Sequence, residues 1–204
     1  MGRLLPVVDE RRKHEIYREE RIADLKSYLR DHFPAGSEVG LELGCGHGHW
    51  LTALAESQPE RYLLGADLIT NRIERAQIKQ DKRSLRNLHF KKAEAYELLE
   101  AWPDDLKLSA VFMLFPDPWP KKKHFKNRMV QPQLLDRLSE LMAPGARFHF
   151  RTDHDDYFEW TLDIFGRRSD WEINEEAEWP LEVPTVFQKL MTSWNTLIAE
   201  RSAH

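Results

Sequence analysis

The sequence predicts an α/β fold in which helices cover both faces of a mostly parallel β-sheet. Short apolar segments typical of buried strands recur along the chain, and helix-length amphipathic stretches lie between them. Strands that alternate with helices in this way form doubly wound, Rossmann-like sheets, whose parallel strands are buried on both faces. The segments that we expect to form strands are 37–43, 62–66, 88–90, 109–115 and 146–150.

Further elements are expected before and after these strands. Residues 9–32 have the pattern of a polar helix with balanced charges, within an N-terminal helical arm (1–35) that packs on the core or on a partner. Residues 131–142 form an amphipathic helix that Pro144 and Gly145 should stop. A last helix is expected over 155–165, and further strands over 171–174 and 195–199.

The composition indicates one soluble domain that spans residues 1–204. The chain has 41% hydrophobic and 31% charged residues, with a formal net charge of -4. Its one cysteine, Cys45, excludes an intrachain disulfide and a cysteine-based zinc site, and it favours a reducing, cytoplasmic location. No apolar run approaches the roughly 20 residues that cross a bilayer, and the nine histidines have no metal-binding spacing. We therefore expect neither a membrane partner nor a metal.

A glycine turn follows the first expected strand. Gly44, Gly46 and Gly48 lie between that strand and a helix, where glycines let the backbone bend tightly and let a ligand approach main-chain N–H groups. A tight turn that binds nothing is the simpler alternative. The G-x-G-x-G spacing after Glu42 differs from the G-x-G-x-x-G spacing that cradles a pyrophosphate, which disfavours a nicotinamide-dependent oxidoreductase. It resembles motif I of S-adenosylmethionine-dependent methyltransferases.

Two more acids follow the second and third expected strands. Asp67 ends the second strand, where a carboxylate can reach the hydroxyl pair of a ribose. Glu94 follows the third strand, where such methyltransferases contact the amine of an adenine. The same position is equally suited to the N-cap of a helix over 95–101.

Positive charge is concentrated in two segments. Residues 121–128 carry five formal positive charges and no acid, and residues 79–92 carry six against Asp81 alone. One basic face could therefore meet a polyanion, although a solvated charged helix would explain either segment alone.

The most specific segment follows the fourth expected strand. It reads Phe-Pro-Asp-Pro-Trp-Pro-Lys-Lys-Lys-His over residues 115–124, so three prolines fix an acid and an aromatic ring beside a run of cations. With Lys126, Arg128 and Gln131-Pro132, it resembles the tRNA (guanine-N7-)-methyltransferase family. The resemblance extends over residues 38–160 and, more weakly, over Thr185 to Gln188.

That resemblance implies a class I methyltransferase fold, S-adenosylmethionine as the cofactor, tRNA as the partner, and a variable-loop guanosine as the methyl acceptor. It places Asp117 in catalysis. It implies a cofactor site of Glu42, Gly44, Gly46, Gly48, Asp67, Glu94 and Asp117, and a substrate site of Lys121, Lys123, Arg128, Asp153, Thr185 and Gln188. Gln188 replaces a usual glutamate, while Asp67 and Glu94 exchange the usual Glu and Asp. The oligomeric state, monomer or homodimer, stays open.

These residues suit attack by guanine N7, which has an in-plane lone pair and no proton to remove. Positioning should dominate, and Asp117 or Asp153 can stabilise the charge that develops on the purine or select guanine. Trp119 or Phe125 could stack on the exposed base. For Trp119, we expect a ring that packs against the sheet instead.

Two other functions are compatible with the sequence. Asp117-Pro118-Trp119 distantly resembles the loop of enzymes that methylate exocyclic amines, although the second proline of that loop is missing. A non-catalytic RNA-binding module that kept the fold is the other alternative, with Gln188 as its best support.

Overall fold

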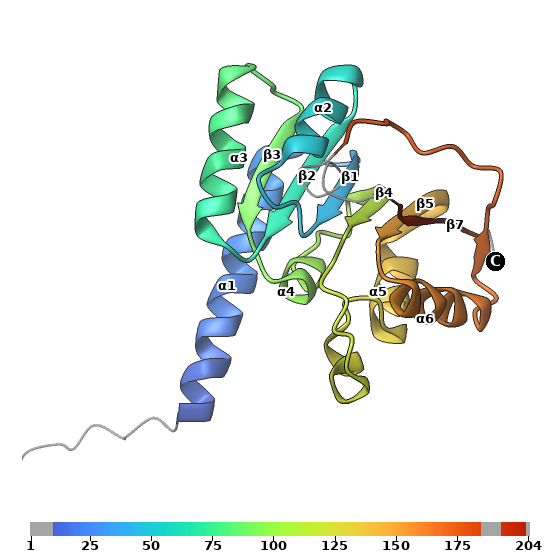
Figure 1. Cartoon of the computed structure of the whole chain (residues 1–204). Helices are drawn as coiled ribbons and strands as arrows, with labels where there is room; N and C mark the ends of the chain where they lie inside the picture. Colours follow the sequence, from blue (N-terminus) through green and yellow to red (C-terminus); the bar gives the residue numbers. More distant parts are fainter. Residues whose placement is uncertain (1–9, 185–192, 203–204) are drawn as a thin grey trace, which may run out of the picture.

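A seven-stranded sheet organises the chain in the computed structural model, which describes residues 10–184 and 193–202. The strand order is β3-β2-β1-β4-β5-β7-β6 (Figure 1). The first five strands are parallel, and β7 lies antiparallel between β5 and β6. The strands are β1 (Glu38–Leu43), β2 (Tyr62–Asp67), β3 (Leu88–Lys92), β4 (Lys107–Leu114), β5 (Met142–Thr152), β6 (Trp171–Ile173) and β7 (Asn195–Arg201). The expected fold class is therefore confirmed.

Helices cover both faces of this sheet, as the sequence predicts. They are α1 (Glu10–His32), α2 (His49–Ser57), α3 (Thr70–Lys82), α4 (Ala95–Glu100), α5 (Pro132–Leu141) and α6 (Asp155–Gly166). A short 3-10 helix that the sequence does not predict, η1 (Lys122–Asn127), lies in the basic segment. No helix of the described residues is long and apolar enough to cross a membrane.

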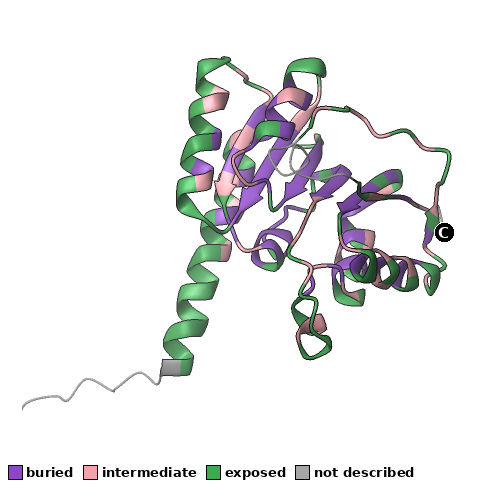
Figure 2. Cartoon of the chain, in the orientation of Figure 1, coloured by how far each residue is buried: buried purple, intermediate pink, exposed green. Residues whose placement is uncertain are grey.

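The sheet separates two hydrophobic clusters, because successive strand side chains point to opposite faces. In β4, Val111 and Met113 pack with residues of α1, α4, α5 and α6. Ala110 and Phe112 pack with residues of α2 and α3. The central strands β1, β2 and β4 are mostly buried, whereas the outer strands carry more exposed residues (Figure 2). The strand order reverses between β1 and β4, and ligands of open α/β sheets bind beyond the carboxyl ends of the strands at such a point.

One helix boundary differs from the expectation. Helix α5 ends at Leu141, and Met142 already pairs with Leu108 as the first residue of β5. Pro144 and Gly145 therefore lie within β5, in an irregular stretch where its register with β4 shifts. Gly145 suits this stretch because its φ is +83°.

The arm packs on the core through the second half of α1. Leu25, Leu29 and Phe33 are buried, and Arg21 of α1 forms an ion pair with Glu97 of α4. Residues 11–20 are exposed and extend beyond the body of the domain (Figures 1 and 2). The alternative of packing on the core is confirmed for this part of the arm.

Residues 174–184 cross the sheet face that carries α2. The Trp50 indole donates to the Leu181 carbonyl at 3.0 Å. The buried Arg151 guanidinium stacks 3.9 Å from the centre of the Trp179 ring and forms an ion pair with Glu182. These contacts hold residues 179–182 against α2 and β5.

Candidate active site

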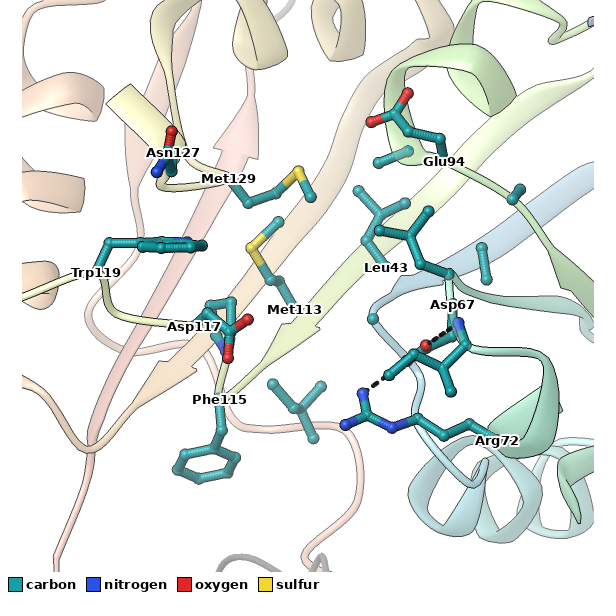
Figure 3. Close-up of a pocket in the computed structure, with 18 residues that line it drawn as sticks. Leu43, Asp67, Arg72, Glu94, Met113, Phe115, Asp117, Trp119, Asn127 and Met129 are labelled. Carbon is teal, nitrogen blue, oxygen red and sulfur yellow. Dashed lines mark hydrogen bonds and ion pairs between the residues drawn. The ribbon is translucent and has the colours of Figure 1, made fainter. Parts of the chain in front are cut away.

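Two adjoining pockets lie beyond the carboxyl ends of β1 to β4. Figure 3 shows the residues that line the larger pocket. The volumes of the two pockets are about 360 Å³ and about 150 Å³. They form one cleft, because they share Gly44, Arg72, Leu114, Phe115 and Asp117. A cleft of this size and position can hold a small-molecule cofactor.

The glycine turn contributes two of its three glycines to the cleft. Gly44 and Gly46 line it, and both have positive φ. Gly48 lines neither pocket and caps α2 instead. A Cβ there would lie 2.5 Å from the Phe90 ring and 2.8 Å from Ala76. Gly48 therefore has a packing role, because it lets α2 pack closely on β3 and α3. Its contact with the cofactor stays a prediction.

Glu42 forms a buried wall of the smaller pocket. It is 3% exposed, and its Oε2 accepts no hydrogen bond from the described residues. Burial, together with the charge of Asp67, raises the pKa of Glu42 to about 8. The carboxyl group is therefore protonated at neutral pH and lacks the partner that a bound ligand would supply.

The raised pKa of Glu42 predicts a pH-dependent cost to folding. The ordinary pKa is 4.5, so between pH 4.5 and pH 8 the unfolded chain has released a proton that the folded chain keeps. Stability should therefore fall as pH rises through this window. Glu42→Gln should match the wild type near pH 4.5 and exceed its free energy of unfolding by a few kcal/mol at pH 8.

Urea unfolding at both pH values measures this difference. Glu38→Gln is the matched control, because Glu38 is an exposed glutamate of the same strand, and we expect it to leave the pH dependence unchanged. Parallel stability curves for the wild type and Glu42→Gln would contradict the prediction.

Asp67 joins the end of β2 to the glycine turn. Its Oδ2 accepts from the Gly46 amide at 3.0 Å, and its Oδ1 accepts from the Ile69 amide at 2.8 Å. Arg72, in the first turn of α3, lies 3.4 Å from the same carboxylate. These contacts hold a buried carboxyl group in the wall of the larger pocket.

Glu94 lines the larger pocket and caps α4. Its Oε2 accepts from the Glu97 amide at 2.9 Å, so the capping role is confirmed. The contact occupies Oε2 and therefore leaves Oε1 for a ligand donor in the pocket.

The loop after β4 holds Asp117 at the junction of the pockets. The backbones of Phe115 and Trp119 have φ values of +53° and +44°, which is strained for bulky residues. The Trp119 side chain lines the larger pocket and is 37% exposed. The expectation that this ring packs against the sheet is therefore wrong.

Arg128 shapes this loop from inside. It is 1% exposed, and it donates to the carbonyls of Pro118 at 2.9 Å and Asp156 at 3.0 Å. Its guanidinium lies 3.7 Å from the centre of the Phe125 ring, and burial lowers its pKa. The expectation that Arg128 contacts RNA is corrected, because its charge is buried under the loop.

Three other expected substrate residues that the structure describes line neither pocket: Lys121, Lys123 and Asp153. Lys121 and Lys123 are exposed at η1 and make no ion pair with any described residue. In the second basic segment, Arg83 and Lys91 form ion pairs with Glu56 and Asp24. Asp153 is exposed just after β5, at the same edge of the sheet as the pockets. Thr185 and Gln188 lie outside the described residues.

Several pocket residues are not identified by the sequence analysis. No sequence pattern identifies Arg72 as a pocket residue, because its contact with Asp67 depends on where α3 begins in the fold. Leu68 and Ile69 line the larger pocket and are exposed. Two apolar residues directly after the acid of β2 are a signal that could have identified them. Asn127 and Met129 reach the pocket only because Arg128 turns the chain back.

Comparisons with known proteins agree with this architecture. The sequence model of a family described as "Putative methyltransferase" matches residues 37–202. A tRNA (guanine-N(7)-)-methyltransferase of Mesorhizobium japonicum is 36% identical over 81% of this chain and 72% of its own length. One of a Caulobacter species (strain K31) is 35% identical over 66% of this chain. A methyltransferase structure from Pyrococcus furiosus, at 15% identity, superimposes with a TM-score of 0.59 over 90% of this chain and 83% of its own.

The matched length differs between these relatives. The chain covers 59% of the Caulobacter protein. The Pyrococcus structure shares only the fold with this chain.

Proposed function

Because this chain belongs to the tRNA (guanine-N7-)-methyltransferase family, we propose that it transfers a methyl group from S-adenosylmethionine to guanine N7 in tRNA. The acceptor is a variable-loop guanosine, which becomes 7-methylguanosine, and the reaction takes place in the cytoplasm. One observation carries the proposal. Four carboxyl groups at or just beyond the carboxyl ends of β1 to β4, those of Glu42, Asp67, Glu94 and Asp117, line one cleft beside an exposed lysine cluster.

The cleft fits S-adenosylmethionine by the chemistry of its donor set. Asp67 would accept the ribose hydroxyls and Glu94 the adenine amine, with Leu68 and Ile69 as apolar contacts to the base. Gly44 leaves room for a close approach, since nothing lies within 4 Å of its missing Cβ. The Oε2 atom of Glu42, which accepts no hydrogen bond from the described residues, would gain a partner in a positively charged part of the cofactor.

When bound, S-adenosylmethionine supplies a methyl group on a positively charged sulfur. Guanine N7 has a lone pair and no proton, so the residues of the cleft would have to orient the base toward that methyl group and would not have to remove a proton. Asp117 lies where the two pockets meet and would stabilise the positive charge that develops on the purine. Asp153, at the neighbouring strand end, would accept from the guanine N1–H and N2–H groups.

Methyl-labelled S-adenosylmethionine and unmodified transcribed tRNA test this function directly. Nucleoside mass spectrometry should find the label in 7-methylguanosine, and a tRNA with adenosine at the target position should stay unlabelled. Label in a base methylated on its exocyclic amine would instead support the first alternative. Cofactor and tRNA binding without any transfer would support the non-catalytic module.

The lysines of η1 should provide phosphate contacts. Lys121→Ala combined with Lys123→Ala should weaken tRNA binding and reduce the slope of log affinity against log salt by about 1.5 to 2. Filter binding between 50 and 200 mM salt, about the range over which phosphate contacts dominate, measures both effects.

A charge-matched control removes two cations from the opposite edge of the sheet. Lys107 opens β4, Arg30 lies in the last turn of α1 just before β1, and both are exposed. Their double alanine variant should keep the wild-type slope. If the two double variants gave the same slope, η1 would not be the RNA contact.

A further inference from the structure

The proposed reaction needs a surface that holds the target purine beside Asp117, and this further inference rests on that function. A purine lifted out of its stack loses base contacts, which an aromatic face can replace. Three phenylalanine or tryptophan rings lie in the loop between β4 and α5: Phe115, Trp119 and Phe125.

Two of these rings are occupied by other groups. Phe125 packs against the Arg128 guanidinium and the Trp160 ring. Phe115 meets the Trp194 ring edge to face, at 6.4 Å between centres. Both rings are therefore less suited to receive a base.

Trp119 is different in its exposure and direction. Among the described residues, its one ring contact is with the edge of His124, at 5.7 Å between centres, and 37% of the residue is exposed. The indole points into the larger pocket, beside Asp117 and opposite Met113 and Met129 (Figure 3). A base that reaches the Asp117 carboxylate would therefore pass the face of this ring.

The backbone of the loop is strained where it holds the indole in this direction. The φ of Trp119 is +44°, a region that a tryptophan rarely adopts, and Pro118 and Pro120 flank it. Arg128 fixes the preceding peptide by donating to the Pro118 carbonyl, and it is itself clamped by Asp156 and Phe125. Strain that the surroundings maintain at a pocket is typical of a pre-organised binding group.

We propose that the Trp119 indole is the stacking platform for the target purine, and that Arg128 is a positioning residue that keeps this platform in place. Stacking of one base on an aromatic side chain changes affinity by about 5- to 150-fold when the ring is removed. The platform acts on the base alone, so its contribution depends on whether the target position carries a base.

That dependence defines the experiment. Binding of wild-type protein and Trp119→Ala is measured on two tRNAs that differ only at the target nucleotide, which is guanosine in one and abasic in the other. The wild type should bind the guanosine tRNA at least fivefold more tightly, and Trp119→Ala should lose this preference. Trp119→Phe, with a smaller ring, should retain part of it. Affinity for S-adenosylmethionine should stay within twofold of the wild type in both variants.

Trp194→Ala is the matched control, because Trp194 is also 37% exposed but lines neither pocket. It should keep the preference for the guanosine tRNA. Arg128→Lys keeps a positive charge but loses the planar group that contacts two carbonyls and the rings, so it should reproduce the loss seen in Trp119→Ala.

Four results would overturn the proposal. If Trp119→Ala weakens both tRNAs equally, the ring has only a structural role. If it weakens S-adenosylmethionine binding and keeps the base preference, the ring belongs to the cofactor wall. If the wild-type protein places the label outside 7-methylguanosine, the proposed function and the stacking platform are both overturned. If the wild type labels 7-methylguanosine but Trp119→Ala keeps the preference for the guanosine tRNA, only the platform is overturned.

Discussion

Replacing Asp117 with asparagine should lower the rate of methyl transfer at least about a hundredfold, a loss typical of removing one group that stabilises a developing charge. The product base carries a positive charge, and the carboxylate of Asp117 lies at the junction of both pockets. Asparagine keeps the shape of the side chain but not its charge. Binding should change little, because phosphate contacts at the lysines, away from Asp117, supply most of the attraction for RNA.

Single-turnover transfer from labelled S-adenosylmethionine measures the chemical step, and filter binding of tRNA measures affinity. Asp104→Asn is the control, since Asp104 is an exposed aspartate in the loop before β4, at the other edge of the sheet. It should leave both quantities unchanged. A transfer rate for Asp117→Asn within threefold of the wild type would remove Asp117 from the chemistry.

The variant Asp153→Asn distinguishes the role of Asp153 from that of Asp117. If Asp153 accepts from the guanine edge, its amide variant should raise the KM for tRNA more than it lowers kcat. An equal loss in kcat for both variants would mean that the two acids stabilise the same charge. A loss confined to Asp153→Asn would exchange their roles.

The features that the sequence reveals are those set by local patterns. Buried parallel strands appear as continuous apolar runs, so β1 to β5 can be predicted, with errors of up to four residues at their ends. The antiparallel strands β6 and β7 are also found close to their expected ranges. The acids at strand ends can also be predicted, because parallel strands bring their carboxyl ends to one edge. Glu42, Asp67, Glu94 and Asp117 meet in one cleft for this reason.

The features that sequence reasoning misassigns depend on packing between distant segments. Arg128 belongs to a basic run, and only the fold shows that Pro118 and Asp156 provide carbonyls that bury it. Trp119 is apolar, and only the backbone geometry between two prolines turns its ring to the pocket. A residue type and its neighbours in sequence therefore do not determine whether a charge or a ring faces solvent.

Gly48 is the sharpest instance, because its place in a G-x-G-x-G motif predicts a ligand contact while its surroundings predict a packing role. Gly48→Ala should lower the free energy of unfolding by about 3 kcal/mol or more. Part of this loss, about 1 kcal/mol, comes from a Cβ at a φ of +67°. The remainder comes from a Cβ 2.5 Å from the Phe90 ring, which a rigid sheet and α3 cannot easily accommodate.

Two other glycines separate these contributions. Gly36 has a φ of +80° and Gly44 a φ of +76°, and a Cβ at either would have nothing within 4 Å. Their alanine variants should each cost only about 1 kcal/mol in urea unfolding. Gly44→Ala should in addition weaken S-adenosylmethionine binding, because this glycine lines the cleft.

Gly48→Ala protein that remains folded at low temperature should bind the cofactor like Gly36→Ala. Equal stability losses at all three positions would refute the packing role, and a selective loss of cofactor binding in Gly48→Ala would restore the ligand contact that the motif suggests.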